Sequence, residues 1–335
     1  MPAEARIDAS VLELRDPEAT IRTIADGLVR TVRRFRRRGA VLGLSGGIDS
    51  SVVAALAARA FGPERVLGVL MPETDSDPDT LRLSRLAADA FGIETVLEEV
   101  APALTALGCY RRRDDAIRKV LPDYGDGWTS KIVLPSVIDS EAFRLFSVVA
   151  RDPDGTEHRA RLTPEAYLEV VAATSFKQRT RKMVEYHHAD RLVYAVLGTP
   201  NRLEYDQGFF VKGGDGAADV KPIAHLYKTQ VYALAEALGV PEEIRARPPT
   251  TDTYSMPQSQ EEFYFALPYA AMDLCLYAVD HGLPATAVTK ALDLTPQQAT
   301  RVFDDIAAKR RVARYLHASP VLLGTVGAES RFDAA

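Results

Sequence analysis

The chain has 335 residues, of which 47% are hydrophobic and 26% are charged. This ordinary globular composition gives ample length for a large core, as one large domain with additions or as two small domains. The formal net charge of −5 disfavours a general nucleic-acid-binding surface. The two cysteines show no pairing pattern, and no apolar run approaches the roughly 20 residues of a membrane span. We therefore expect a protein of the reducing cytoplasm, with neither a membrane nor a nucleic acid as partner.

The first hundred residues alternate between helix and strand patterns. Apolar residues recur at helical spacing after Asp16, and a run of arginines closes this helix. We interpret that run as a solvated helix end; it comprises Arg33, Arg34, Arg36, Arg37 and Arg38. Strands are expected at 40–44, 66–70 and 94–100, with helices at 51–61 and 79–91. This alternation predicts an α/β fold, a doubly wound parallel sheet with helices on both faces.

The remainder of the chain carries one hairpin signal and several helix signals. Segments 146–150 and 158–162 flank a turn at 152–155, which predicts a β-hairpin. Helices are expected at 164–173, 176–189 and 228–238, and a fourth strand at 192–197. Thr295 and Gln298 form the capping-box pattern that opens the last long helix.

A glycine-rich loop with the sequence GLSGGIDSS (residues 43–51) joins the first strand to its helix. A helix N-terminus offers free N–H groups and the positive end of the helix dipole, which suit a phosphate. Gly46 and Gly47 allow the backbone to approach that phosphate, and Asp49 adds a carboxylate for Mg²⁺. The loop lacks the Gly-Lys-Ser/Thr ending of the Walker A motif. It resembles the SGGxDS pyrophosphate loop of the ATP pyrophosphatases, which cut ATP to AMP and pyrophosphate while adenylating a substrate.

A second group of motifs makes the resemblance more specific. The chain reads LGTPNRLE at 197–204, GFFVK at 208–212, GDG at 214–216 and LYKTQVY at 226–232. With the glycine loop, in this order and spacing, these motifs resemble the NAD synthetase family, whose members convert deamido-NAD to NAD with ATP and ammonia. The resemblance covers about residues 20–100 and 175–255, and it implies an adenine nucleotide alpha hydrolase-like fold.

The residues themselves point to the chemistry of ATP cleavage. Thr199 ends the fourth strand beside the glycine loop, where its hydroxyl and backbone can contact ATP. Asp49 and Glu204 supply the hard oxygen ligands that Mg²⁺ prefers. Lys212 and Lys228 are candidates for offsetting the negative charge that builds on the pyrophosphate. Asp49, Lys212 and Lys228 are therefore the candidate catalytic residues.

The resemblance assigns the other site residues. It implies ATP contacts from Gly43, Leu44, Ser45, Gly46, Gly47, Ile48, Asp49, Ser50, Ser51, Met71, Thr199, Lys228 and Thr250. It implies acceptor contacts from Arg179, Lys212, Asp219 and Lys309, and metal ligation by Asp49 and Glu204. ATP and Mg²⁺ are the implied cofactors, and a homodimer is the implied assembly.

The departures from the family pattern lie mostly on the acceptor side. The segment 101–174 is longer than the usual link, Pro200 and Arg202 alter the LGTGNKSE pattern, and Ala308 stands where the family has a histidine before Lys309. The segment 253–265 also differs from the usual acidic segment. We expect one NAD synthetase-like domain over 1–335, with an atypical insertion at 101–174 and a mainly helical C-terminal extension at 256–335.

The favoured function is an ammonia-dependent amidating ligase that adenylates deamido-NAD. No glutaminase domain is expected, so the ammonia is either free or delivered by another protein. The main alternative is a related ligase for a different carboxylic acid. An RNA-modifying adenylating enzyme is disfavoured by the acidic charge and by the lack of a CxxC pair. A nucleotide-binding regulator without turnover is disfavoured by the presence of Asp49, Glu204 and Lys228.

Overall fold

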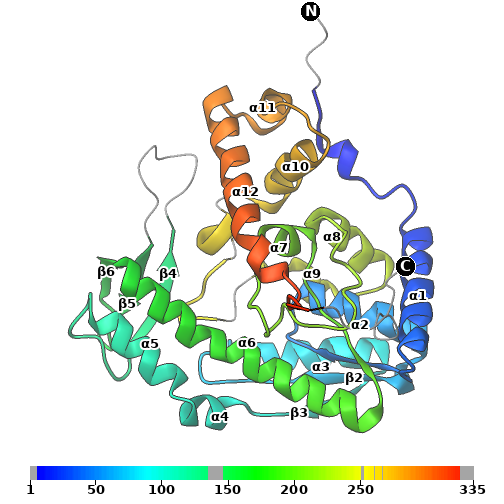
Figure 1. The fold of residues 1–335 in the computed structure, drawn as a ribbon, viewed down its shortest axis with the longest axis horizontal. Coiled ribbons are helices and arrows are strands. Elements are labelled where there is room, and N and C mark those ends of the chain that lie inside the picture. The colour runs from blue at the N-terminus through cyan, green and yellow to red at the C-terminus, as the bar shows by residue number, and fades with distance from the viewer. Residues whose placement is uncertain (1–5, 135–145, 250–252, 260, 266, 325–335) are drawn as a thin grey trace, which may run out of the picture.

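A parallel sheet of four strands lies at the centre of the computed structural model, which describes residues 6–134, 146–249, 253–259, 261–265 and 267–324 (Figure 1). The strands are β1 (Ala40–Gly43), β2 (Val66–Leu70), β3 (Glu94–Leu97) and β7 (Ala195–Val196). Their order is β3-β2-β1-β7, so β1 pairs with β2 on one side and with β7 on the other. The winding reverses between β1 and β7, and α/β sheets bind ligands at such a switch point.

Helices cover both faces of this sheet because side chains alternate along each strand. Leu42 of β1 packs into a core with α1, α2, α3 and α8 on one face. Val41 points to the opposite face, where it packs with α4 and α6. The predicted doubly wound sheet is confirmed. These helices are α1 (Pro17–Arg34), α2 (Ile48–Phe61), α3 (Thr80–Phe91), α4 (Ala101–Ala106), α6 (Pro164–Leu192) and α8 (Lys228–Ala237).

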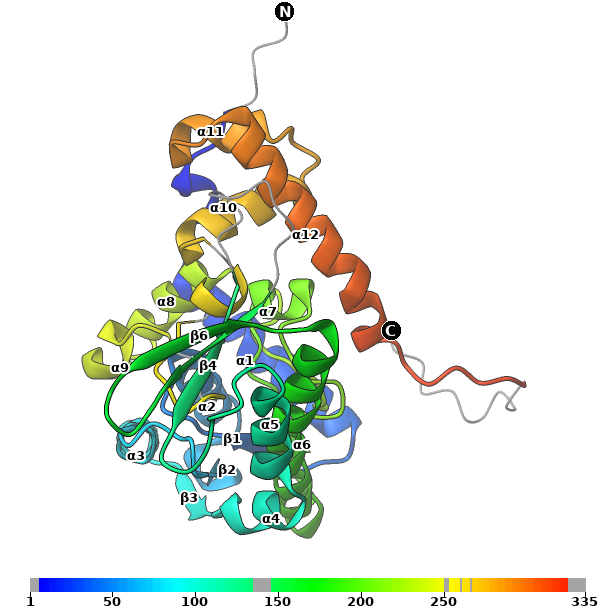
Figure 2. The same cartoon turned by 90° about the vertical axis from the view of Figure 1, so that its left-hand side faces the viewer.

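A second, antiparallel sheet lies beside the first half of α6 (Figure 2). It consists of β4 (Thr129–Val133), β5 (Ser147–Arg151) and β6 (Glu157–Arg161), in that order. The predicted hairpin is confirmed as β5 and β6, and Asp152 holds its turn by accepting a hydrogen bond from the Thr156 amide at 2.9 Å. Neither β4 nor the preceding α5 (Cys109–Arg118) was predicted from the sequence.

The prediction of two separate helices at 164–173 and 176–189 is wrong, because α6 is one helix of 29 residues. Two hydroxyl residues at the predicted break remain helical by bonding back to the preceding turn. Thr174 donates to the carbonyl of Val170 at 3.0 Å, and Ser175 donates to that of Val171 at 2.7 Å. Figure 1 shows α6 running from the small sheet across to the far side of the central sheet.

The C-terminal helices form a core of their own above the central sheet (Figures 1 and 2). The predicted capping box of Thr295 and Gln298 is confirmed at the start of α12. Short helical turns occur at η1 (Ala9–Leu12), η2 (Pro63–Arg65) and η3 (Glu261–Phe265). The remaining helices are α7 (Arg202–Gln207), α9 (Glu242–Ala246), α10 (Tyr269–Asp280), α11 (Thr286–Leu292) and α12 (Pro296–His317).

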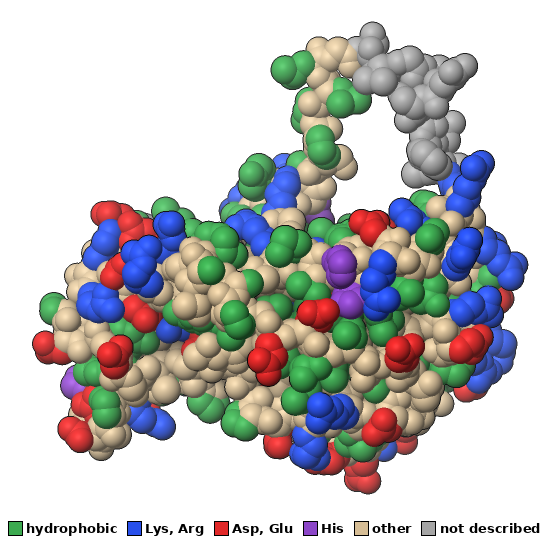
Figure 3. Space-filling model, turned by 90° about the horizontal axis from the view of Figure 1, so that it is seen from below, with side chains coloured by type: hydrophobic (Ala, Val, Ile, Leu, Met, Phe, Trp, Pro, Cys, Tyr) green, Lys and Arg blue, Asp and Glu red, His purple; other side chains and the backbone are tan. Residues whose placement is uncertain are grey.

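The arginines at the end of α1 are solvated, as the sequence indicated. Arg33, Arg34, Arg36 and Arg38 are exposed and Arg37 is half-buried. Lys and Arg side chains gather along the right-hand edge of Figure 3, which is the side on which α1 lies in Figure 1. Within the described ranges, no helix is both long and apolar enough to cross a membrane.

Candidate active site

The glycine loop follows β1 and leads directly into α2, as predicted. Gly46 has a φ of +70°, and a Cβ there would lie 2.7 Å from the Cβ of Leu83, so only glycine fits without displacement. Ser84 ties the loop to α3, because its hydroxyl donates to the carbonyl of Leu44 at 2.8 Å. The loop backbone is therefore fixed before a ligand arrives.

A cavity of about 1060 Å³ opens over this loop. Most of the residues singled out from the sequence line it: Gly43, Leu44, Ser45, Gly46, Gly47, Ile48, Asp49, Ser50, Met71, Arg179, Thr199, Glu204, Lys212 and Lys309. The volume lies at the upper end of the range for small-molecule sites. The structure thus brings the ATP-side and acceptor-side residues to one space, while their individual roles stay predictions.

Three predicted residues that the structure describes do not line the cavity. Ser51 is buried beneath the loop, where its hydroxyl donates to the carbonyl of Gly47 at 2.9 Å. Asp219 accepts from the Val196 amide at 2.8 Å, a contact that holds the end of β7. Lys228 is fully buried behind Asp49. Thr250 lies outside the described residues.

Asp49 is the centre of a polar cluster beneath the glycine loop. Its Oδ2 pairs with the ammonium of Lys228, and its Oδ1 accepts from Asn201 Nδ2 at 3.2 Å. Glu204 shares a capping box with Asn201, and its carboxylate accepts a hydrogen bond from the backbone N–H of Asn201 at 3.1 Å. Burial alone lowers the pKa of Lys228, but the charges of Asp49 and Glu204 outweigh it and raise that pKa above its usual value. Lys228 therefore remains a cation under the loop.

Asp273 of α10 fixes the position of Lys228 from the other side. The amides of Lys228 and Thr229, at the start of α8, donate to its two carboxylate oxygens at 3.2 and 2.7 Å. Burial raises the pKa of Asp273 to about 6, although these amide contacts oppose the shift. The C-terminal helices thus help to hold the ATP side, a contact that the sequence analysis missed.

A second charged cluster lies beside Gly43 of the glycine loop and was also missed. Lys182 Nζ bonds Glu185 Oε2 at 2.6 Å on α6, and Asp215 accepts from the Val211 amide at 2.8 Å. Burial raises the pKa values of Glu185 and Asp215 above their usual range. Two features of the sequence could have revealed this cluster. They are the Lys and Glu at i,i+3 spacing in a helical segment, and the aspartate of the GDG motif at 214–216.

Three cations predicted to bind the acceptor lie on or near the C-terminal helix α12. Lys212 Nζ donates to the carbonyls of Tyr315 and Ala318, at 2.7 and 2.9 Å, at the end of α12. Arg179 Nε donates to the Lys212 carbonyl at 3.2 Å. Lys309 pairs with Asp305 at 2.7 Å. The hydrogen bonds from Lys212 therefore hold the end of α12 at one side of the cavity.

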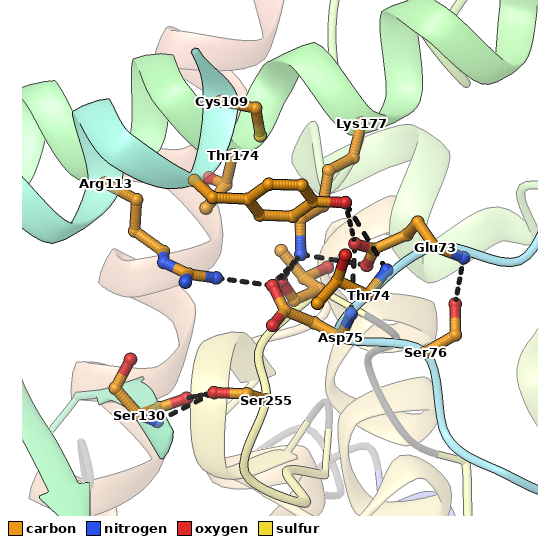
Figure 4. A network of polar contacts seen from close by, with 12 residues as sticks. Glu73, Thr74, Asp75, Ser76, Cys109, Arg113, Ser130, Thr174, Lys177 and Ser255 are labelled. Carbon is orange, nitrogen blue, oxygen red and sulfur yellow. Dashed lines mark hydrogen bonds and ion pairs between the residues drawn. The ribbon is translucent and has the colours of Figure 1, made fainter. Parts of the chain in front are cut away.

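Behind the cavity, Lys177 joins three segments of the chain (Figure 4). Its ammonium lies 2.6 Å from Asp75 Oδ2 and 2.9 Å from Glu73 Oε1, and it donates to the Thr253 carbonyl at 2.7 Å. Lys177 is 1% exposed, so these contacts replace the water that its charge has lost. The loop after β2 is thus locked onto α6.

Helix α5 completes this network. Arg113 pairs with Asp75, and the hydroxyl of Tyr110 donates to Glu73 Oε2 at 2.8 Å. Cys109 is buried and free, and its thiol donates to the Ala173 carbonyl at 3.2 Å (Figure 4). Cys275 is also buried and free, in keeping with the absence of a pairing pattern.

Comparison with known proteins identifies the family. The family model for NAD synthase matches residues 20–119 and 154–313. A protein of Rhizobium meliloti (strain 1021) named NH(3)-dependent NAD(+) synthetase is 60% identical over 311 residues, which cover 93% of each chain. This chain belongs to the NAD synthase family.

Solved structures of NAD synthase relatives share the fold. The structure of NMN synthetase from Francisella tularensis matches with a TM-score of 0.64 and 20% identity, covering 92% of this chain and 98% of that one. An NH3-dependent NAD synthetase from Campylobacter jejuni matches with a TM-score of 0.60 and 22% identity, over 92% of this chain and 100% of that one. At these identities the likeness supports the α/β fold alone.

The NAD synthase match omits residues 120–153. This unmatched stretch includes all of β4 and all of β5, and it falls within the segment 101–174 that the sequence marked as an insertion. It contributes Leu134 and Phe146 to the cavity lining. The stretch that lies outside the family-model match therefore reaches the candidate active site.

Proposed function

We propose that this protein is an ammonia-dependent NAD synthetase, a carbon–nitrogen ligase that converts deamido-NAD to NAD with ATP and ammonia. One observation carries the proposal: a single cavity joins the glycine loop, with Asp49 and Glu204, to the acceptor-side cations Arg179 and Lys212. A ligase of this kind must hold ATP and a carboxylate together in one space. Nothing in the geometry favours a different acid.

The reaction needs positioning and charge compensation rather than a protein nucleophile. An acceptor carboxylate oxygen attacks the α-phosphorus of ATP, the bond to pyrophosphate breaks, and an acyl adenylate forms. The N-terminus of α2 presents its free N–H groups to the pyrophosphate, and the buried cation of Lys228 lies just behind. Ammonia then attacks the acyl carbon, and AMP leaves.

The residues around the glycine loop also fit Mg²⁺. Asp49 and Glu204 line the cavity and offer carboxylate oxygens, which Mg²⁺ prefers together with phosphate oxygens and water. We infer that these two residues hold the metal, which when bound neutralises charge on the phosphates. No group of three or more potential ligands from Asp, Glu, His and Cys occurs among the described residues, so the nucleotide would complete the coordination.

The second half of the reaction needs a proton acceptor, because ammonium must lose a proton before its nitrogen can attack. Glu185 is buried and Asp215 is half-buried, and both carboxyl groups line the cavity. A carboxyl group whose pKa is raised by burial is a better base than an exposed one. We infer that this pair receives the proton from ammonium.

The test is a product assay with ATP, Mg²⁺, ammonium and deamido-NAD. The proposal expects NAD, AMP and pyrophosphate in equal amounts, and little NAD when glutamine replaces ammonium. Formation of ADP in place of AMP, or no amide from deamido-NAD, would contradict it. By family resemblance we further propose a homodimer, which sedimentation at assay concentration checks.

A further inference from the structure

Four charged side chains of alternating sign form a ring on one side of α7. Arg202 Nη2 of α7 donates to Asp280 Oδ2 of α10 at 2.6 Å, and Arg310 Nη2 of α12 donates to Asp280 Oδ1 at 2.5 Å. Arg310 Nε also donates to Asp206 Oδ2 at 2.7 Å. Arg202 and Asp206 are four positions apart, so one turn of α7 closes the ring. We call these four residues the α7 clamp.

The clamp is partly shielded from water, which strengthens its ion pairs. The side chains of its two carboxylates are 14% and 23% exposed, and those of its two arginines are 32% and 30% exposed. Charges at such positions are screened less than fully exposed ones, and here they act as a network rather than as single pairs. Asp280 also accepts a hydrogen bond from the Tyr227 hydroxyl at 3.1 Å. Because Tyr227 directly precedes Lys228, the same carboxylate holds the start of α7 and the start of α8.

The opposite side of α7 faces the cavity. Glu204 lies two positions from both Arg202 and Asp206, which is a rotation of about 200° around the helix. Its side chain therefore points away from the clamp, and it lines the cavity together with the glycine loop. Helix α7 has only six residues, and a helix this short takes its orientation from the contacts around it. The clamp thus holds the outer side of the helix whose inner side carries Glu204.

Helix α12 links the clamp to the acceptor side of the cavity. Lys309 lines the cavity, whereas the next residue, Arg310, belongs to the clamp. The lower half of α12 in Figure 1 lies against α7. The contact is close, because a Cβ added to Gly208 would lie 2.9 Å from the Cβ of Ala313. One set of ion pairs therefore fixes the spacing between the inferred metal ligand Glu204 and the predicted acceptor cation Lys309.

We propose that the α7 clamp positions Glu204 for binding the Mg²⁺ that accompanies ATP. The four clamp residues lie outside the cavity lining, so they act on the nucleotide through Glu204 and not by touching it. Mg²⁺ tolerates little departure from octahedral geometry, so a carboxylate displaced by about 1 Å binds the metal much less well. This inference rests on the proposed function, in which Glu204 is a metal ligand.

The experiment measures, by calorimetry, the binding of an ATP analogue with a methylene group between its α- and β-phosphates, once with Mg²⁺ and once with EDTA. Asp280→Asn removes the charge that both arginines of the clamp share. Its affinity for the analogue with Mg²⁺ should fall about tenfold, as for other residues that orient metal ligands. Its affinity in EDTA should equal that of the wild-type protein, because the glycine loop is unchanged.

Two substitutions at Arg310 repeat the test from α12. Arg310→Gln should show the same Mg²⁺-dependent loss, and Arg310→Lys should lose less because it keeps the charge without the guanidinium fork. Arg311→Gln is the matched control: this neighbouring arginine is exposed, so the same change in charge should leave both affinities unaltered. Urea unfolding checks the fold of each variant. If Asp280→Asn does not fold, Arg310→Gln decides, since it leaves the pair of Arg202 and Asp280 in place.

An equal loss of affinity with Mg²⁺ and with EDTA would overturn the proposal, because a merely structural role lowers both. Wild-type affinities in folded Asp280→Asn and Arg310→Gln would overturn it as well. Failure of the proposed metal site is distinguishable. In that case the wild-type protein would bind the analogue equally well with Mg²⁺ and with EDTA, or Glu204→Gln would keep the full effect of Mg²⁺.

Discussion

The two ends of the cavity are built in different ways. The glycine-loop end is made by consecutive residues between β1 and α2, with Asp49 and Lys228 paired beneath them. The aromatic end is assembled from rings that are far apart in sequence, on the edge of β5, on α6 and in η3. The first end is polar and held by ion pairs, whereas the second is apolar and held by packing.

This difference follows from the two tasks. Cleaving a phosphoanhydride requires donors and charges fixed in place before the substrate arrives, and a strand–loop–helix unit supplies them locally. Joining the small sheet to α6 requires only matching apolar surfaces, which the rings at the other end provide. Substitutions at the polar end should therefore change the rate of reaction, and those at the aromatic end the stability of the fold.

The largest effect is expected from Asp49→Ala. Loss of a metal ligand and of the partner of Lys228 should lower kcat by roughly 10³-fold. The same change leaves a buried ammonium unpaired, so the free energy of unfolding should fall by about 3 kcal/mol. Steady-state assays and urea unfolding measure the two effects.

The double variant Asp49→Ala/Lys228→Met separates activity from stability. Removing both charges should restore most of the unfolding free energy but none of the activity. Recovery of turnover in the double variant, or full activity in Asp49→Ala, would show that Asp49 is not part of the chemistry.

A substitution at Lys177 tests the buried network that joins α6 to the loop after β2. Lys177→Met leaves Glu73 and Asp75 with one fewer buried cation, which should lower the free energy of unfolding by about 3 kcal/mol. The KM for ATP should not change, because Lys177 does not line the cavity. Lys119→Met is the control: its ion pairs with Glu165 and Glu169 lie at the surface, so urea unfolding should move little. A large rise in the KM for ATP for Lys177→Met, with the fold intact, would contradict a purely structural role of Lys177.

Gly46→Ala tests how tightly the loop is built. A Cβ at this positive φ meets Leu83 at 2.7 Å, so the loop must move, and we expect the KM for ATP to rise about tenfold. Gly239→Ala has a similar φ of +74° but nothing within 4 Å, so it should cost about 1 kcal/mol of stability and leave that KM unchanged. An unaltered KM for ATP in Gly46→Ala would mean that the loop is not pre-formed.

A pH dependence of stability is expected from Asp273. Its pKa is raised from 3.8 to about 6, so the folded protein holds this proton more tightly than the unfolded chain does. The contribution of this group to stability therefore falls as the pH rises from about 4 to about 6, by about 3 kcal/mol at most. Asp273→Asn removes this slope. The unfolding free energy of the wild-type protein minus that of Asp273→Asn, measured in urea, should therefore be more positive at pH 4 than at pH 7. Parallel pH curves would refute the assignment.

The sequence revealed the local part of this design. The glycine loop, the parallel sheet and the β5–β6 hairpin rest on patterns within a few residues, and all three were predicted. The continuous α6 was missed because Thr174 and Ser175 interrupt its apolar spacing, although both hydroxyls bond within the helix. The Lys177 network joins residues about a hundred positions apart, and no local pattern indicates such a contact.

The aromatic end was beyond prediction for a related reason. Phe146 was assigned to a strand and Tyr167 to a helix, but their stacking depends on how the small sheet packs against α6. Periodicity indicates that a ring is buried, not which ring it meets.

The most direct test of this account is the structure of the protein bound to deamido-NAD and an ATP analogue that resists cleavage between its α- and β-phosphates. We predict that the nicotinate carboxylate lies beside the α-phosphate at the glycine loop, in the cavity that Arg179 and Lys212 line. A carboxylate bound away from the α-phosphate, with the nucleotide still at the loop, would contradict the proposed function.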